Sequence, residues 1–381
     1  MRRWTRWRTP LLALLAALAV VALLLALTPQ GRTLLKTALL VPQLVPAIPV
    51  KPQESLGPEV VRQEVRFDAG DVERVGDLYA IPDGQRRAAV VLFLGVNPAG
   101  RDDPRVVNLS EALARAGMVV LVPWSESMVE RRIEPQDADR LVHAFQYLQA
   151  RPNVDPQRVG LGGFCVGASF SLVAAADPRI ADQVAFVNFF GGYHDGSDLL
   201  AQIASRTSYY RGERHPWEPG DLTREVFTQH LLESVPDAEE RRLLEERLAS
   251  GQPIGNPDDL SPEAQVVARL LSGPTLEEAQ ELVSQLPAQA RQRLETVSPS
   301  TVVEGVRARV LIMHGRGDDL VPVEESRRLR DALQRRDVPM YYTEFVLFQH
   351  MDPTRPVDLL TFAREAWKLY WHLYQVVRVA S

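Results

Sequence analysis

The chain has 381 residues and a mass of 42.6 kDa, and 45% of its residues are hydrophobic and 24% charged. These values are close to globular averages and exclude a wholly disordered, collagen-like or coiled-coil protein. The formal net charge of −6 argues against a nucleic-acid partner. The single cysteine, Cys165, excludes an intramolecular disulfide, so the stability must come from an ordinary apolar core.

An apolar run stands near the N-terminus. Leu11–Leu27 comprises 17 residues without a charge, and four arginines and two tryptophans precede it. As a helix this run spans roughly 25 Å, and a basic flank with interfacial tryptophans is typical of a membrane anchor. We therefore predict an N-terminal transmembrane helix within residues 1–28, a single-pass membrane protein, and a catalytic domain on the extracytoplasmic side. The alternative is a cleaved signal peptide and a secreted protein.

The next segment is apolar but contains prolines. Thr33–Val50 has three of them, and proline removes a backbone donor and restricts φ. We predict a Pro-rich tether over residues 29–58. A linker packed partly on the following domain is the alternative.

From residue 59 the pattern alternates between strands and helices. Ala88–Leu94 is a continuous apolar run, as expected of a parallel strand covered on both faces. An antiparallel hairpin precedes it, and amphipathic helices separate the later strands. This order predicts an α/β fold with a mostly parallel central sheet and helices on both faces. The other predicted strands are Val60–Phe67, Leu78–Ile81, Met118–Val122, Val159–Gly162, Val184–Phe190, Arg309–Met313 and Met340–Leu347.

About a hundred residues in the second half lack a buried strand. Residues 195–300 instead contain polar helical segments rich in leucine and glutamate, such as Ala238–Ala249 and Leu276–Leu286. Because core strands stand on both sides, we interpret this interval as a helical cap insertion. The α/β core is then divided into residues 59–194 and 301–381.

The strongest candidate for chemistry is a short motif around the cysteine. Gly163-Phe164-Cys165-Val166-Gly167 follows a predicted strand and precedes a helix of small residues. This is the form of a nucleophile elbow, in which a strained turn projects the nucleophile and glycines allow the strand and helix to approach closely. The N–H of Val166 is then free to bind an oxyanion.

An acid and a base follow in the order that this kind of site requires. Asp318 lies in a loop directly after the strand Arg309–Met313, and His350 follows the last predicted strand. The acid would orient the imidazole, and the imidazole would help to form the nucleophilic thiolate. Asp319 is the fallback for the acid.

At these residues the chain resembles the α/β-hydrolase superfamily and, within it, the dienelactone hydrolase family, which uses a Cys-Asp-His triad. The resemblance covers about residues 60–375 without the cap, and Gly95-Val96-Asn97 matches a loop of that family. The resemblance implies an α/β-hydrolase fold and a catalytic triad of Cys165, Asp318 and His350. It also implies a second oxyanion N–H from the loop after the third strand, for which we name Phe93 and Leu94.

Some family positions differ in this chain. Leu92 stands where the family has a glutamate, and the arginines that bind the substrate carboxylate have no clear match. We name Trp124 and Tyr193 as candidate substrate-binding residues, and Arg355 as a substitute for a family arginine. Hydrolysis of dienelactone itself is therefore not expected.

The sequence thus predicts a membrane-anchored hydrolase that cleaves a small-molecule ester, thioester or lactone through a cysteine acyl-enzyme. No metal or other cofactor is expected, because ligand residues with suitable spacing and phosphate-binding glycine loops are absent from the sequence. The sequence indicates no oligomeric state. Two alternatives stay open: a non-catalytic binding or scaffold module on the same fold, and an acyltransferase.

Overall fold

A computed structural model describes Val20, Leu23 and residues 27–70, 72–250, 259–348, 350 and 355–380. Its centre is an eight-stranded sheet in the order β1-β2-β4-β3-β5-β6-β9-β10. Strand β2 is antiparallel to both of its neighbours. The remaining strands, in the sheet order β4, β3, β5, β6, β9 and β10, are parallel to one another. The strands are β1 (Val61–Asp68), β2 (Glu73–Ala80), β3 (Arg87–Phe93), β4 (Met118–Pro123), β5 (Val154–Phe164), β6 (Val184–Phe190), β9 (Arg309–Gly315) and β10 (Met340–Phe345).

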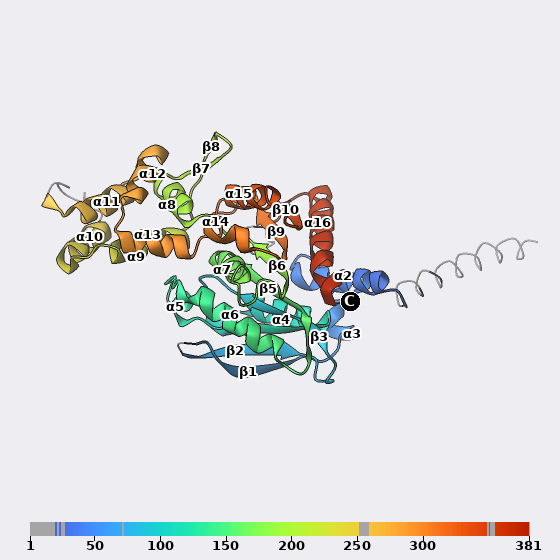
Figure 1. Cartoon of the computed structure of the whole chain (residues 1–381). Helices are drawn as coiled ribbons and strands as arrows, with labels where there is room; N and C mark the ends of the chain where they lie inside the picture. Colours follow the sequence, from blue (N-terminus) through green and yellow to red (C-terminus); the bar gives the residue numbers. More distant parts are fainter. Residues whose placement is uncertain are drawn as a thin grey trace, which may run out of the picture.

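Helices cover both faces of this sheet, as the continuous apolar strands predict (Figure 1). The side chains of β3 alternate between two apolar clusters: Ala89, Val91 and Phe93 join one, and Val90 and Leu92 join the other. The first cluster contains α6 (Gln136–Gln149), α7 (Val166–Ala175) and α15 (Val323–Gln334), and the second contains α2 (Pro29–Leu44), α4 (Pro104–Arg115) and α16 (Leu359–Val377). The prediction of a mostly parallel α/β sheet is therefore confirmed.

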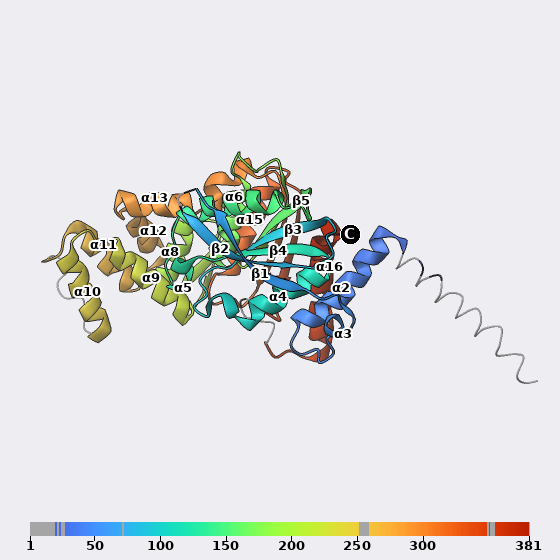
Figure 2. The ribbon, with the colours of Figure 1, turned by 90° about the horizontal axis from the view of Figure 1, so that it is seen from below.

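A third apolar cluster holds the helices between β6 and β9 together. These helices form a lobe, which is called the cap below, at the end of the molecule opposite to α2 and α16 (Figures 1 and 2). A two-stranded hairpin, β7 (Thr207–Tyr210) and β8 (Glu213–Pro216), stands among them and was not predicted. The helices are α8 (Gly196–Ser205), α9 (Asp221–Glu233), α10 (Ala238–Ser250), α11 (Pro262–Leu271), α12 (Leu276–Ser284) and α13 (Ala288–Thr296), and the short α14 (Pro299–Val302) leads back to the core.

The segment predicted as a Pro-rich tether forms α2 and the short α3 (Pro52–Leu56). Helix α2 packs against the core: Leu40 is fully buried, and the Tyr370 hydroxyl donates to the Leu34 carbonyl at 3.0 Å. Pro42 lies in the last turn of the helix, so the intrahelical hydrogen bond that it cannot donate is lost close to the helix end. There, Lys51 donates hydrogen bonds to the carbonyls of Pro42 and Val45.

The predicted transmembrane helix requires a correction. Within the described part of the chain, no helix is both long enough and apolar enough to cross a membrane. Most of Leu11–Leu27 lies outside the described residues, and α2, the helix that follows it, has 16 residues and includes Arg32 and Lys36. The expectation rested on a run shorter than the ~20 residues that a span usually needs. The predicted anchor and the predicted single-pass location are therefore not supported.

Buried histidines make the fold sensitive to acid. His372 is fully buried against Asn188 and Thr343, and burial lowers its pKa to about 3. An unfolded histidine takes up a proton below about pH 6.5, which the folded side chain does not, so stability falls as the pH drops through that value. We expect His372 alone to reduce the free energy of unfolding by about 2 kcal/mol between pH 7 and pH 5.

Thermal unfolding at these two pH values measures the effect, and His372→Gln should reduce the pH dependence of the midpoint. An equal fall in midpoint in the wild type and in the variant would contradict the assignment.

Candidate active site

The cysteine stands on the sharp turn that the sequence predicts. Strand β5 ends at Phe164, α7 begins at Val166, and Cys165 between them has a φ of +52°. This left-handed conformation is costly for a residue with a side chain, and such strain is concentrated at functional sites. A Cβ on Gly163 would lie 2.2 Å from the Gly167 carbonyl oxygen, and one on Gly167 would lie 2.4 Å from that of Phe93. The two glycines are therefore needed for the close passage of strand and helix.

The acid and the base meet beside this turn. Asp318 follows β9, His350 follows β10, and the His350 Nδ1 lies 2.9 Å from Asp318 Oδ2 and 3.1 Å from Oδ1. The carboxylate also accepts the backbone N–H groups of Leu320 and Val321. These bonds hold the carboxylate in one orientation, so the imidazole presents its other nitrogen, Nε2, away from Asp318.

The electrostatics favour a charged pair. Burial by itself would lower the pKa of His350, but the charge of Asp318, that of Cys165 and hydrogen bonds with both side chains raise it well above its ordinary value. Burial opposes ionisation of Asp318 too, yet the charge and hydrogen bond of His350 keep its pKa below the usual range. The three side chains therefore form one interacting set.

Gly191, which sequence reasoning missed, borders this set. It has a φ of +63°, and a Cβ there would lie 3.4 Å from Asp318 Oδ2 and 3.7 Å from His350 Cε1. A Cβ at these distances would make ordinary van der Waals contacts, so it is the positive φ rather than the space that favours glycine here. A positive φ cannot be recognised in the sequence Phe190-Gly191-Gly192 alone.

The loop after β3 lies against the cysteine. A Cβ on Gly95 would be 3.1 Å from both the Val166 nitrogen and Cys165 Cβ. Val96 and Val166 line the same cavity as Cys165, whereas Phe93 ends β3 and Leu94 is buried in the opposite cluster. The loop thus lies beside the nucleophile, and the second oxyanion N–H from Phe93 or Leu94 stays a prediction.

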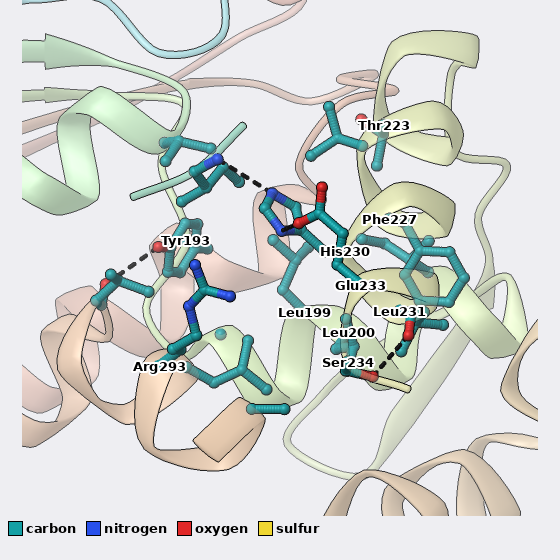
Figure 3. Close-up of a pocket in the computed structure, with 18 of the residues that line it drawn as sticks. Tyr193, Leu199, Leu200, Thr223, Phe227, His230, Leu231, Glu233, Ser234 and Arg293 are labelled. Atoms are coloured by element: carbon teal, nitrogen blue, oxygen red, sulfur yellow. Dashed lines mark hydrogen bonds and ion pairs between the residues drawn. The ribbon is translucent and has the colours of Figure 1, made fainter. Parts of the chain in front are cut away.

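A cavity of about 290 Å³ opens in front of Cys165. Tyr193 lines it from the core and is held by a hydrogen bond from its hydroxyl to the Val297 carbonyl. Most of the remaining wall comes from α8, α9 and α13 of the cap (Figure 3). The cap therefore forms a large part of the space in which a substrate would lie.

The other two predicted substrate-binding residues do not line this cavity. The Trp124 indole donates to the buried Asp77 at 2.8 Å, in a cluster with Arg62 and Arg101. Arg355 is exposed, and its guanidinium lies beside Gly317 in the loop that carries Asp318, called the acid loop below. Arg293 and His230, from the cap, do line the cavity and were not predicted, because nothing in the sequence places them near Cys165.

The acid loop is also held by the cap. The Trp217 indole donates to the Asp318 carbonyl at 2.8 Å, the Gly220 N–H to the Asp319 carbonyl, and the Thr223 hydroxyl to the Leu320 carbonyl. Three successive carbonyls of the loop thus accept hydrogen bonds from residues 217–223. Trp217 is therefore a candidate positioning residue for Asp318.

Replacing Trp217 by phenylalanine should lower kcat about fivefold to tenfold with little change in KM, since a lost hydrogen bond of about 1 kcal/mol would loosen the acid rather than the cavity. Steady-state kinetics on an activated ester measures this split. Trp367→Phe is the matched control, because Trp367 is 62% exposed on α16. A rise in KM at unchanged kcat would contradict a positioning role.

In the part of the chain that the structure describes, no group of three or more histidine, cysteine or carboxylate side chains could hold a metal ion.

Comparisons with known proteins agree with this geometry. Residues 76–213, which contain Cys165, match the model of the dienelactone hydrolase family, and residues 274–355, which contain Asp318 and His350, match that of the prolyl oligopeptidase family. A solved structure of DcsB in complex with its substrate analogue is 16% identical, with a TM-score of 0.50, covering 84% of this chain and all of the other. This likeness concerns the fold.

Two curated relatives match a shorter part. A Bradyrhizobium protein named "Probable 2-oxo-3-(5-oxofuran-2-ylidene)propanoate lactonase" is 27% identical over 141 residues, which is 31% of this chain and 56% of the relative. A Mycobacterium tuberculosis (strain CDC 1551 / Oshkosh) protein named as a phosphoribosyl transferase is 30% identical over 164 residues, 41% of this chain and 36% of the relative. Less than two thirds of either relative is covered.

Strand order, elbow and matches together define a protein with the α/β-hydrolase fold. Within that superfamily the chain resembles the dienelactone hydrolase family, as its sequence predicts, and its C-terminal part also resembles the prolyl oligopeptidase family.

Proposed function

We propose that this protein is a hydrolase that cleaves an ester, thioester or lactone through an acyl-enzyme on Cys165. The observation that carries the proposal is the hydrogen-bonded pair of His350 and Asp318 beside a cysteine at a strained elbow that opens into a cavity. The two family matches, one of which includes Cys165 and the other Asp318 and His350, support hydrolase chemistry on a carbonyl group.

In the first half-reaction, the Cys165 sulfur attacks the substrate carbonyl carbon, and His350 holds the proton released from the thiol. The N–H of Val166 and one from the loop after β3 bind the negative oxygen of the tetrahedral intermediate. The intermediate collapses, the carbon–oxygen or carbon–sulfur bond to the leaving group breaks, and His350 protonates the leaving group.

In the second half-reaction, His350 takes a proton from water, and the resulting hydroxide attacks the thioester carbonyl. Collapse of this intermediate releases the carboxylic acid and restores Cys165. Asp318 stabilises the imidazolium in both halves and keeps Nδ1 protonated, so that Nε2 exchanges the protons. An acceptor other than water in this step would make the protein an acyltransferase.

An amide substrate is the second candidate, and the match to the prolyl oligopeptidase family favours it. An amine is a poorer leaving group than a thiolate, so the tetrahedral intermediate on Cys165 would return to the amide unless His350 protonates the nitrogen first. A cysteine nucleophile therefore favours esters and thioesters.

Trapping the acyl-enzyme tests the proposal. After mixing with an excess of p-nitrophenyl ester and quenching in acid, intact-mass measurement should show one added acyl group, and peptide mapping should locate it on Cys165. Release of this group by neutral hydroxylamine would identify a thioester. Steady ester turnover that Cys165→Ala retains in full would rule out covalent catalysis by Cys165, and the absence of both turnover and adduct would support a binding module instead.

A further inference from the structure

The cavity in front of Cys165 is apolar along most of its wall. Helix α8 contributes Leu199, Leu200 and Ile203, α9 contributes Val226 and Phe227, and α13 contributes Leu294. Leu199 packs against both the core cluster that contains α7 and the cap cluster. It therefore stands where the cavity passes from the catalytic core into the cap.

The polar side chains of the wall are mostly engaged with the protein itself. The His230 Nε2 accepts the Ile133 N–H at 3.1 Å, and its Nδ1 lies 3.6 Å from the Glu233 carboxylate. The Ser234 hydroxyl donates to the Leu231 carbonyl (Figure 3). Arg293 lines the cavity with a side chain that remains exposed to solvent. The interior thus offers an occupant mainly apolar contact, and charge is found at its edge.

The size of the cavity limits the occupant. An apolar protein cavity of roughly 150 Å³ holds one benzene, which has six carbons. A volume of about 290 Å³ is nearly twice as large, so the space suits an apolar group of about eight to twelve carbons. A small lactone would leave most of the apolar wall without a partner.

The site also indicates which part of a substrate enters. Cys165, Val166 and Val96 line the cavity, whereas His350 does not. The leaving group must depart next to His350, which protonates it, while the acyl group stays on the sulfur. The acyl side of the substrate therefore faces the cavity, and the leaving group lies on the side of His350.

We propose that the cap cavity is an acyl pocket and that the substrate is an ester or thioester of an apolar carboxylic acid of about eight to twelve carbons. This inference rests on the proposed function and adds the substrate class to it. Leu199 is the side chain expected to set the accepted acyl chain length, because it packs against both the core cluster and the cap cluster.

The first experiment is a chain-length series of p-nitrophenyl esters from acetate to hexadecanoate, each below its critical micelle concentration. The value of kcat/KM should rise about threefold per methylene up to about ten carbons, because each newly buried methylene gains nearly its transfer free energy. Beyond about twelve carbons it should fall. A second series lengthens the alcohol on an acetate ester and should show no comparable rise.

Variants locate the effect. Leu199→Phe should move the optimum to shorter chains, and Leu199→Ala to longer ones, because the substitution removes or adds space in the cavity. Leu243→Phe is the matched control, because Leu243 packs in the cap cluster from α10 but does not line the cavity. The acyl chain length preferred by this variant should stay at about ten carbons. Circular dichroism checks that each variant is folded.

Binding without turnover separates this inference from the proposed function. Calorimetry with decanoate on Cys165→Ala should show saturable binding that is about tenfold weaker when Leu199→Phe is added. If decanoate binds but the wild-type protein turns over no ester, the acyl pocket is supported and the proposed hydrolase function is refuted. Turnover that is insensitive to acyl length, or that rises only with alcohol length, would overturn the acyl pocket while the hydrolase stands.

Discussion

Cys165→Ala should reduce kcat/KM for a p-nitrophenyl ester by about a thousandfold or more, because loss of the nucleophile removes the covalent route entirely. The folded state should change little, since the exchange removes one sulfur atom from a side chain that is only partly buried. Initial rates of p-nitrophenol release measure the effect, and thermal unfolding checks the fold.

A control for this substitution is available on the helix that follows the elbow. Ser171 lies on α7 and its hydroxyl donates to the Gly162 carbonyl, away from the cavity. Ser171→Ala should keep most of the activity. Full turnover by Cys165→Ala would refute the assignment, and equal losses in both variants would indicate damage to the elbow rather than loss of the nucleophile.

Asp318→Asn should lower kcat by about three to four orders of magnitude, the scale found when the orienting acid of a serine triad is neutralised. An amide can present its NH₂ group to Nδ1 and so favour the wrong tautomer of His350. Because the Asp318 charge raises the pKa of His350, its removal should also lower that pKa. An NMR titration of the His350 ring measures this shift independently of activity.

Asp319→Asn is the matched control. The neighbouring carboxylate lies near Gly220 and makes no hydrogen bond with His350 among the described contacts. Its neutralisation should change kcat less than about threefold and shift the His350 titration far less than Asp318→Asn does, since of the two carboxylates only that of Asp318 contacts the His350 ring. The reverse result, a large loss in Asp319→Asn alone, would move the acid to Asp319.

The strands that could be predicted from the sequence are those that the fold buries on both faces. Strands β3, β4, β6 and β9 are covered on both faces, so they are continuous apolar runs in the sequence and were found within one or two residues. The hairpin β7–β8 was missed because Glu213–Pro216 is exposed throughout and has no apolar periodicity. Strand β5 begins at Val154 rather than at the predicted Val159, because Asp155 and Pro156 are residue types typical of turns.

The sequence by itself determined the elbow and the order of nucleophile, acid and base. These features are local: two glycines, one cysteine and the loops after two strands constrain the backbone within a few residues. The approach of His350 to Asp318 then follows from the adjacent pairing of β9 and β10.

Only the tertiary structure decided what surrounds that chemistry. Trp217 is about a hundred residues from Asp318 in sequence, Leu199 meets the core through the cap, and Trp124 binds Asp77 instead of facing the cavity. Contacts between distant segments depend on how several helices pack together, and amphipathic helices with similar composition can pack in many ways. No single sequence motif therefore predicts which residues line the cavity.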